Sequence, residues 1–304
     1  MTDVPDVQDT EAVADTLAGF CESLVVSWKQ IGQQAGAGAP SDAPVSLESD
    51  VARRSLSLPD RPKNIEYAAG QIAGELVGAI SLLLQAVATQ LRARPVVPLT
   101  IWPLVRAELE YAGRVAWLLE PLQDSEAGSL RVARALLEQL SSLQREKYTA
   151  SKHSRPLEKQ RKREREDLLR SIKAIFPDDV YTPMESPEQI AEWKIGEQTM
   201  LSLGKANDLF VQLNFKSGKA VYDTLSDYSH PSVMALARQS VAEESEGVTF
   251  RSYPQDDEVL EYQVRLGCLI LYKAAYTIAN YHGLDANPLE RWADTVPSHW
   301  FSEN

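Results

Sequence analysis

The stretch from residue 99 to residue 120 most constrains what this chain can fold into. It predicts one helix, because Thr100 can cap its start, Pro103 falls in the first turn and Pro121 ends it. Almost every other residue within the stretch is apolar. A helix that is apolar nearly all round belongs in a core, so this segment is expected at the centre of the fold.

Three charged residues interrupt this apolar helix. At about 100° per residue, Arg106, Glu110 and Arg114 fall on one narrow stripe. Two guanidinium groups and a carboxylate enter a core only when they pair with one another or face a polar cavity. The stripe is therefore either a salt-bridge ladder that fixes the helix register or one wall of a polar cleft. Under the second interpretation, its net positive charge suits an anionic group such as phosphate or carboxylate.

The remaining patterns predict an all-α protein. Residues 9–34, 62–92, 130–143 and 257–282 repeat apolar side chains at helical spacing, and Gly283 suits the end of the last helix. We expect a multi-helix bundle with at most one short strand pair, for which only residues 248–253 give a signal. Residues 177–188 are expected to form a surface loop, 188–213 a broken helix, and 232–247 a further helix with an acidic end.

Two segments stand apart from the predicted bundle. Residues 1–46 hold a helix followed by a Gly/Ala/Pro linker, and we expect a mobile arm before a helical bundle domain at 47–304. Within that domain, a basic helical hairpin is expected to protrude at about residues 140–175, with Pro156 separating its two helices and Ser154 capping the second.

The basic hairpin allows two interpretations. Residues 145–170 hold ten Lys or Arg against five acidic residues, in a chain whose net charge is −12. The segment could contact nucleic acid or an acidic partner. Alternatively, it is a solvated hairpin held by pairs such as Glu158 with Lys162 and Glu166 with Arg170. The second interpretation is favoured, because acids are interleaved and Tyr148 is the one aromatic residue available for base stacking.

Composition limits the environment of the chain. The net charge of −12 opposes general binding to nucleic acid or anionic membranes. No apolar run approaches the roughly 18 residues of a membrane span. Cys21 and Cys268 lack a nearby partner in sequence, as ordinary buried thiols in a reducing compartment would. We therefore expect a soluble, cytoplasmic protein that does not bind membranes.

A second polar row follows residue 217. Tyr222, Ser226 and His230 are spaced to share one face of a helix that Pro231 ends. A Ser and a His one turn apart could form a base-activated nucleophile, but an orienting acid and an oxyanion site are also required. The favoured interpretation is structural, with His230 near the carbonyl end of its helix. No catalytic residue is therefore assigned.

Metal and cofactor motifs are missing from the sequence. Asp227 and His230 have the spacing of half a di-iron site, but the second half is not found. No zinc spacing, P-loop or dinucleotide fingerprint occurs either, so neither a metal nor a cofactor is predicted.

The segments 106–121 and 222–231 together resemble a group of bacterial all-helical proteins of unknown function. These proteins carry an Arg…Trp-Leu-Leu-x-Pro helix followed by a Tyr-x-x-Leu-Ser-x-x-x-His helix. The resemblance covers residues 62–283 and implies an all-α fold. The general helical pattern is similar to that of the nucleotide-binding and ribonuclease domains of prokaryotic conflict systems. Those domains place a His four to six residues after an Arg. Here only Lys147 before His153 comes near that spacing.

The leading functional hypothesis is a non-catalytic binding or interaction module. Its ligand site would be a cleft lined by both polar rows: Arg106, Glu110, Arg114, Tyr222, Ser226 and His230. The partner would be an anionic small molecule or a protein. The alternative is an RNA-processing or toxin-like enzyme that uses His230, with the 145–170 segment holding the nucleic acid. The apolar helix at 257–282 and the aromatic tail fit either a homodimer seam or an intramolecular core.

Overall fold

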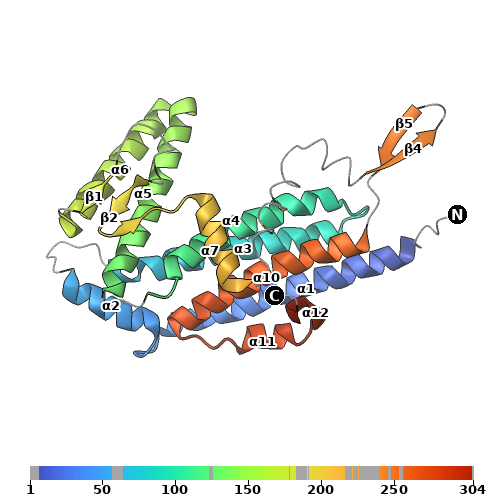
Figure 1. The fold of residues 1–304 in the computed structure, drawn as a ribbon, viewed down its shortest axis with the longest axis horizontal. Coiled ribbons are helices and arrows are strands. Elements are labelled where there is room, and N and C mark those ends of the chain that lie inside the picture. The colour runs from blue at the N-terminus through green and yellow to red at the C-terminus, as the bar shows by residue number, and fades with distance from the viewer. Residues whose placement is uncertain are drawn as a thin grey trace.

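The computed structural model describes residues 7–56, 64–122, 126–177, 179–182, 190, 192–215, 221, 225, 240–245, 248–252 and 256–302. These residues form an elongated helical bundle from which a helical hairpin projects at one end (Figure 1). The all-α class is confirmed. The long helices are α1 (Val7–Gln34), α2 (Pro44–Ser55), α3 (Ala68–Arg92), α4 (Ile101–Leu119), α5 (Ala127–His153), α6 (Arg155–Ile175), α7 (Leu203–Asn214) and α10 (Asp257–His282).

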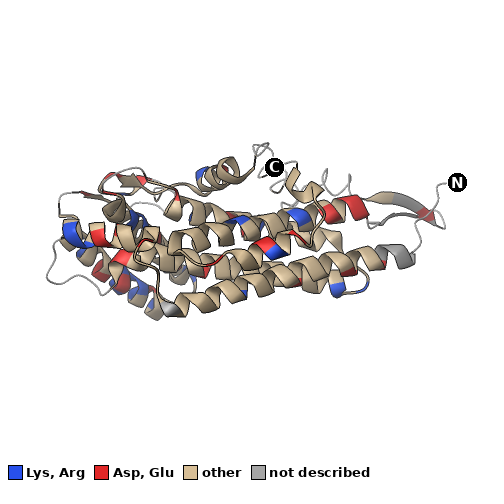
Figure 2. Ribbon diagram, turned by 90° about the horizontal axis from the view of Figure 1, so that it is seen from below, with Lys and Arg blue, Asp and Glu red and all other residues tan. Residues whose placement is uncertain are grey.

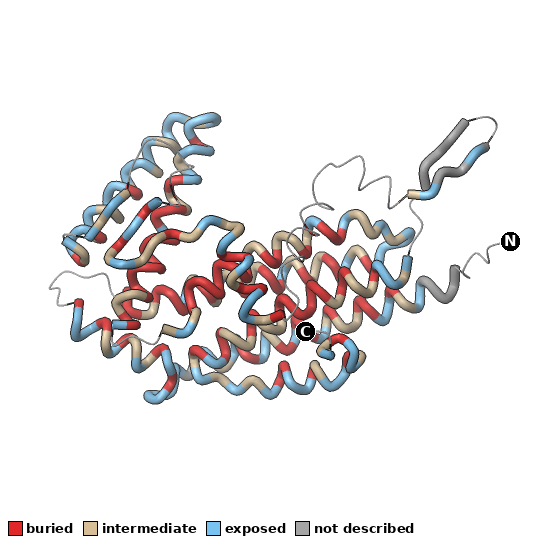
Figure 3. The backbone as a smooth tube through the Cα atoms, in the orientation of Figure 1, coloured by how far each residue is buried: buried red, intermediate tan, exposed pale blue. Residues whose placement is uncertain are grey.

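The core of the bundle lies among α1, α3, α4 and α10, which run side by side along the long axis (Figure 1). Figure 3 shows buried backbone concentrated in these helices and exposed backbone at the hairpin tip. On α4, Val105, Leu109 and Ala112 are fully buried at three- and four-residue spacing. The expectation that α4 lies at the centre of the fold is therefore confirmed.

The boundaries of α4 agree with the proline signals, but its cap does not. Pro103 lies in the first turn and the helix ends at Leu119, two residues before Pro121. The hydroxyl of Thr100 donates to the carbonyl of Val97 at 2.7 Å and caps no helical N–H group. Its backbone is already helical, in a single 3-10 turn, so the side chain does not reach the first turn of α4.

The N-terminal helix is part of the bundle rather than an arm outside it. α1 packs against α3, α10 and the short helix α11 (Asn287–Ala293) and buries Leu17, Cys21 and Leu24. The glycine-rich segment after it suggested a linker, but the apolar stripe of α1 needs a partner surface, and the bundle supplies one. Cys21 meets Cys268 of α10, with 3.8 Å between the two free thiol sulfurs.

The helical stretch Ile65–Arg92 corrects one sequence expectation. Among the described residues it is the one helix long and apolar enough, by length and composition, to cross a membrane. Polar residues interrupt this stretch, but the mean hydropathy of an 18-residue window within it is high enough for a membrane span. A core helix of a soluble protein passes the same test, and α3 packs against α1, α4 and α10. Of its apolar window, 39 % is buried inside the bundle.

The projecting hairpin is built as the sequence predicts. α5 ends at His153, Pro156 lies in the first turn of α6, and the Ser154 hydroxyl accepts a hydrogen bond from the Leu157 N–H. The ion pairs differ in detail from those expected. Lys162 pairs with Glu166 at 3.9 Å, and Arg170 pairs with Asp167.

Strands are more numerous than the one pair expected. β1 (Val180–Tyr181), β2 (Lys194–Ile195) and β3 (Gln198–Thr199) form a small antiparallel sheet where a loop and a broken helix were expected. Gly196, at φ +55°, permits the tight turn between β2 and β3. The predicted strand at 248–253 is β5 (Val248–Ser252), and its partner β4 (Val241–Ser245) lies where helix was expected.

The C-terminal residues close the core of the same chain. α10 ends at His282, and Gly283 follows in the left-handed conformation that was expected. Beyond α11, the short helix α12 (His299–Ser302) buries Trp300, whose indole N–H donates to Glu261 at 2.8 Å. The aromatic tail is therefore used inside the molecule.

One carboxyl group in this core has no partner. Glu108 of α4 is fully buried, and neither of its oxygens has a hydrogen-bond partner among the described residues. Gly267 of α10 makes room for it, since a Cβ there would lie 3.0 Å from Glu108 Oε2. Burial raises the pKa of the Glu108 carboxyl well above its usual range.

Glu108→Met should stabilise the protein, and more so at higher pH. Because the folded pKa is raised, the contribution of Glu108 to stability is fully present below its unfolded pKa of about 4.3 and is lost as pH rises through the folded value. Urea unfolding between pH 5 and pH 8 should give a gain of about 1–3 kcal/mol at the upper end. The exposed Glu75→Met on α3 is the control. A Glu108→Met variant whose stability changes with pH as in the wild type would contradict this account.

Candidate functional site

The charged stripe on α4 divides into two parts. Arg106 and Glu110 pair with each other, with 3.0 Å between Nε and Oε1, and their side chains are 19 % and 30 % exposed. Two of the three residues of the salt-bridge ladder considered for the stripe are therefore paired, as an i,i+4 pair at the edge of the bundle. Neither residue lines the cavity described below.

Arg114, the third member of the stripe, is buried. Its Nη1 donates to the Leu201 carbonyl at 2.9 Å, and its Nε lies 3.8 Å from Glu138 Oε2 on α5. Burial lowers the pKa of Arg114, while Glu138 acts in the opposite direction. This guanidinium therefore joins α4 to α5 and to the residues that precede α7.

The second predicted row cannot be placed relative to the first. Tyr222, Ser226 and His230 lie outside the described residues. Their neighbours Val221 and Leu225 are helical, and Leu225 is fully buried in the core. The convergence of the two polar rows stays a prediction.

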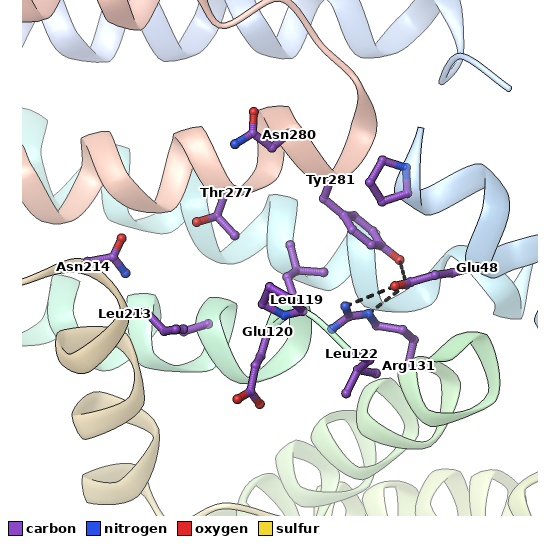
Figure 4. Close-up of a pocket in the computed structure, with 13 residues that line it drawn as sticks. Glu48, Leu119, Glu120, Leu122, Arg131, Leu213, Asn214, Thr277, Asn280 and Tyr281 are labelled. Atoms are coloured by element: carbon purple, nitrogen blue, oxygen red, sulfur yellow. Dashed lines mark hydrogen bonds and ion pairs between the residues drawn. The ribbon is translucent and has the colours of Figure 1, made fainter. Parts of the chain in front are cut away.

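The structure places a cavity of about 470 Å³ at the C-terminal end of α4 (Figure 4). This volume lies within the usual range for small-molecule sites. Five helices and the segment after α4 contribute residues: Pro44 and Glu48 from α2; Ala116, Leu119, Glu120, Pro121 and Leu122 from the end of α4; Arg131 from α5; Leu213 and Asn214 from α7; Thr277, Asn280 and Tyr281 from α10.

A three-residue network forms one wall of this cavity. Arg131 binds Glu48 through both Nε and Nη2, at 2.8 and 3.2 Å, and Figure 4 shows the two side chains facing each other. The Tyr281 hydroxyl donates to the same carboxylate at 3.0 Å, and its ring lies beside the Arg131 guanidinium. Burial, followed by the Glu48 charge, raises the pKa of Tyr281, so its hydroxyl stays a donor. The network thus joins α2, α5 and α10.

Arg131 and Arg134 also close the end of α4. The last carbonyls of a helix lack intrahelical partners and carry partial negative charge. Arg131 Nη1 donates to the Leu118 carbonyl at 2.7 Å, and Arg134 Nη1 donates to the Trp117 carbonyl at 2.5 Å. Because the two arginines are three residues apart on α5, they reach successive carbonyls of the same helix end.

Arg134 continues the network toward the small sheet. Its Nε donates to Gln198 Oε1 of β3 at 2.6 Å, and its Nη2 lies 3.5 Å from Glu120 Oε2. Burial and the neighbouring Arg131 charge lower the pKa of Arg134 to about 10. Its guanidinium therefore remains charged at neutral pH and is matched by Glu120.

A close helix crossing positions Glu48 in front of Arg131. At Gly128 of α5, an added Cβ would lie 2.0 Å from the Glu48 carbonyl oxygen. Only a glycine permits α2 to approach α5 this closely. The backbone contact therefore sets the distance across which the Glu48 and Arg131 side chains meet.

Sequence reasoning missed the residues that form this site. Arg131 and Arg134 interrupt the apolar run of α5 and are only 2 % and 6 % exposed. The same signal that singled out the α4 stripe, charged residues on an apolar helix, was present there at three-residue spacing. Because α5 has the pattern of a regular amphipathic helix, its sequence does not distinguish these two buried arginines from exposed ones.

The cavity offers hydrogen-bonding groups and apolar surface rather than acid–base chemistry. Glu48 and Glu120 are each paired with an arginine. The remaining polar side chains are those of Thr277, Asn280 and Asn214, and the Asn214 amide donates to Phe210. Across the described part of the chain, no group of three or more His, Cys, Asp or Glu side chains is arranged to hold a metal ion.

Comparisons with known proteins found no matching family model, no significantly similar curated protein and no solved structure with a significant match. The resemblance to a bacterial helical group therefore remains an expectation from two motifs. The candidate site rests on the geometry of this chain.

Arg131→Met should lower the free energy of unfolding by about 3–5 kcal/mol, because it leaves the mostly buried Glu48 carboxylate without its cation. The double variant Glu48→Met with Arg131→Met should recover a large part of that loss, since no unpaired charge remains. Urea denaturation measures both effects. Arg92→Met, which breaks exposed pairs with Asp15 and Glu22, should cost at most about 1 kcal/mol and serves as the control.

The single variant Glu48→Met completes the cycle. If the losses in unfolding free energy of the two single variants add up to that of the double variant, the two side chains do not act as a pair.

Proposed function

We propose that this protein is a non-catalytic helical binding module whose ligand site is the cavity at the end of α4. The observation that carries the proposal is the preformed wall made by Arg131, Glu48 and Tyr281. Its hydrogen bonds hold three helices in place without using the space of the cavity. A preformed, partly apolar cavity with a few polar groups is typical of small-molecule sites.

The charge balance favours a ligand that is close to neutral. Arg131, which lines the cavity, already binds Glu48, and Arg134, outside the lining, pairs with Glu120, so neither is free for an anionic group. The anionic ligand expected from Arg106 and Arg114 has no better support, because these arginines pair with Glu110 and Glu138. We therefore propose an uncharged small molecule with an apolar body.

Helix ends add a preference for hydrogen-bond donors. The last carbonyls of α4 are taken by Arg131 and Arg134, but α7 and α10 also end at the cavity, and each contributes residues of its last turn to the lining. The carbonyl ends of helices carry partial negative charge. Ligands with amide N–H or hydroxyl groups should therefore bind better than ligands with acceptors alone.

We also propose a cytoplasmic location, which the two free buried thiols support. The alternative of an RNA-processing enzyme rests on His230, which lies outside the described residues. It stays a prediction from the sequence.

Leu213→Trp should abolish ligand binding by filling the mouth of the cavity. Leu213 is 52 % exposed and lies at the end of α7, so a larger side chain should not disturb the core. A fragment set of ring-bearing primary amides and alcohols, screened by ligand-observed NMR, should yield binders to the wild type. Their affinity should fall at least about tenfold in the variant, and the thermal stabilisation that they give should disappear.

Leu82→Trp is the matched control, because Leu82 is 73 % exposed on α3 and outside the cavity. Fragments that bind Leu213→Trp and Leu82→Trp equally well would place the site elsewhere. A complete lack of binders would remove the support for a ligand cavity.

A further inference from the structure

In the α5–α6 hairpin, ion pairs engage most of the acids and leave most of the cations unpaired. The hairpin projects from one end of the bundle, where Lys, Arg, Asp and Glu are dense along the ribbon (Figure 1, Figure 2). Residues 145–170 hold ten cations and five acids, and the two kinds are interleaved along the sequence.

The structure shows that most of the acids are already engaged. Arg161 alone binds two of them, Glu146 at 2.8 Å and Glu164 at 2.6 Å. Glu166 and Asp167 pair with Lys162 and Arg170. Four of the five acids are thus matched by three cations, and only Glu158 has no ion-pair partner among the described residues.

Six cations of the same segment have no ion pair among the described residues: Arg145, Lys147, Lys152, Arg155, Lys159 and Arg163. Five of them are exposed and Lys147 is half-buried. Arg165, the seventh cation with no ion pair among the described residues, is buried with its guanidinium over the Trp193 ring. The free cations therefore outnumber the free acid at the surface by six to one.

Five of these six cations form two stripes, and Lys147 lies outside them. Arg145 and Lys152 share one face of α5 with Tyr148, which is 46 % exposed and lies beneath the Lys152 ammonium at 4.1 Å. Arg155, Lys159 and Arg163 share one face of α6. By helical periodicity, each stripe lies opposite the face that packs on the other helix, and the two stripes meet at the tip.

We propose that the hairpin tip binds single-stranded nucleic acid through its phosphates. Exposed stripes of Lys and Arg along two outer helix faces suit a repeating anionic backbone. A flexible strand can follow both outer faces of a two-helix hairpin, whereas a duplex is stiff over about 150 base pairs. Tyr148, set between two cations, offers a surface on which a base can stack. This surface is independent of the cavity at α4.

The test measures binding of a fluorescent 20-nucleotide uridine strand by anisotropy at 50–300 mM salt. The wild type should bind, with a log–log salt slope of about −2 to −4, as three to six phosphate contacts require. The triple variant Lys152→Glu, Arg155→Glu, Lys159→Glu should bind at least about tenfold more weakly. Tyr148→Ala should also weaken binding but leave the salt slope unchanged.

The matched control is Lys29→Glu, Lys205→Glu, Arg291→Glu, which makes the same charge change at exposed sites outside the hairpin. It should retain binding, and circular dichroism should show that both triple variants stay folded. The proposal is overturned if the strand does not bind at 50 mM salt, or if both triple variants lose binding equally. Equal or tighter binding of a 20-base-pair duplex or of polyglutamate would also overturn it, and the latter would point to an acidic protein partner.

Discussion

The closing of the α4 C-terminus by two arginines of α5 is the interaction on which the rest of this structure depends. The carbonyls of Trp117 and Leu118 end a buried helix, and buried carbonyls without donors would each cost stability. Arg131 and Arg134 satisfy them and bring Glu48, Tyr281 and Gln198 to the same point through their remaining donors. The cavity exists where these helix ends meet, so its shape follows from the same contacts.

Charged side chains have three different environments along the length of the protein. At the α4 end, arginines are buried and matched, which orders several elements. In the middle of the bundle, Glu108 is buried with no hydrogen-bond partner among the described residues, which disfavours its ionised form and reduces stability as pH rises. At the hairpin tip, cations are exposed and largely unmatched. Of these three groups, the cations of the hairpin are the ones exposed to solvent, so they are the ones that can bind an anionic partner.

How far the sequence predicted the site depends on the range of each interaction. The α4 helix, the break between α5 and α6, and the end of α10 at Gly283 were predicted because prolines, glycines and capping residues act within a few positions. Arg114 was expected in the core and is there, but Glu138 and the Leu201 carbonyl, its partners, were not foreseen. The small β1–β3 sheet was missed because two-residue strands leave no periodic pattern.

By itself, the sequence determined the all-α class, the positions of the long helices other than α2 and α7, and the presence of charged side chains in an apolar core. These are consequences of local spacing along one chain. Only the tertiary structure decided which charges meet: Glu48 and Arg131 are 83 residues apart, and Glu48 and Tyr281 are 233 residues apart. Such pairs form because burial makes an unmatched charge costly, and the partner is whichever opposite charge the packing of apolar faces brings within reach.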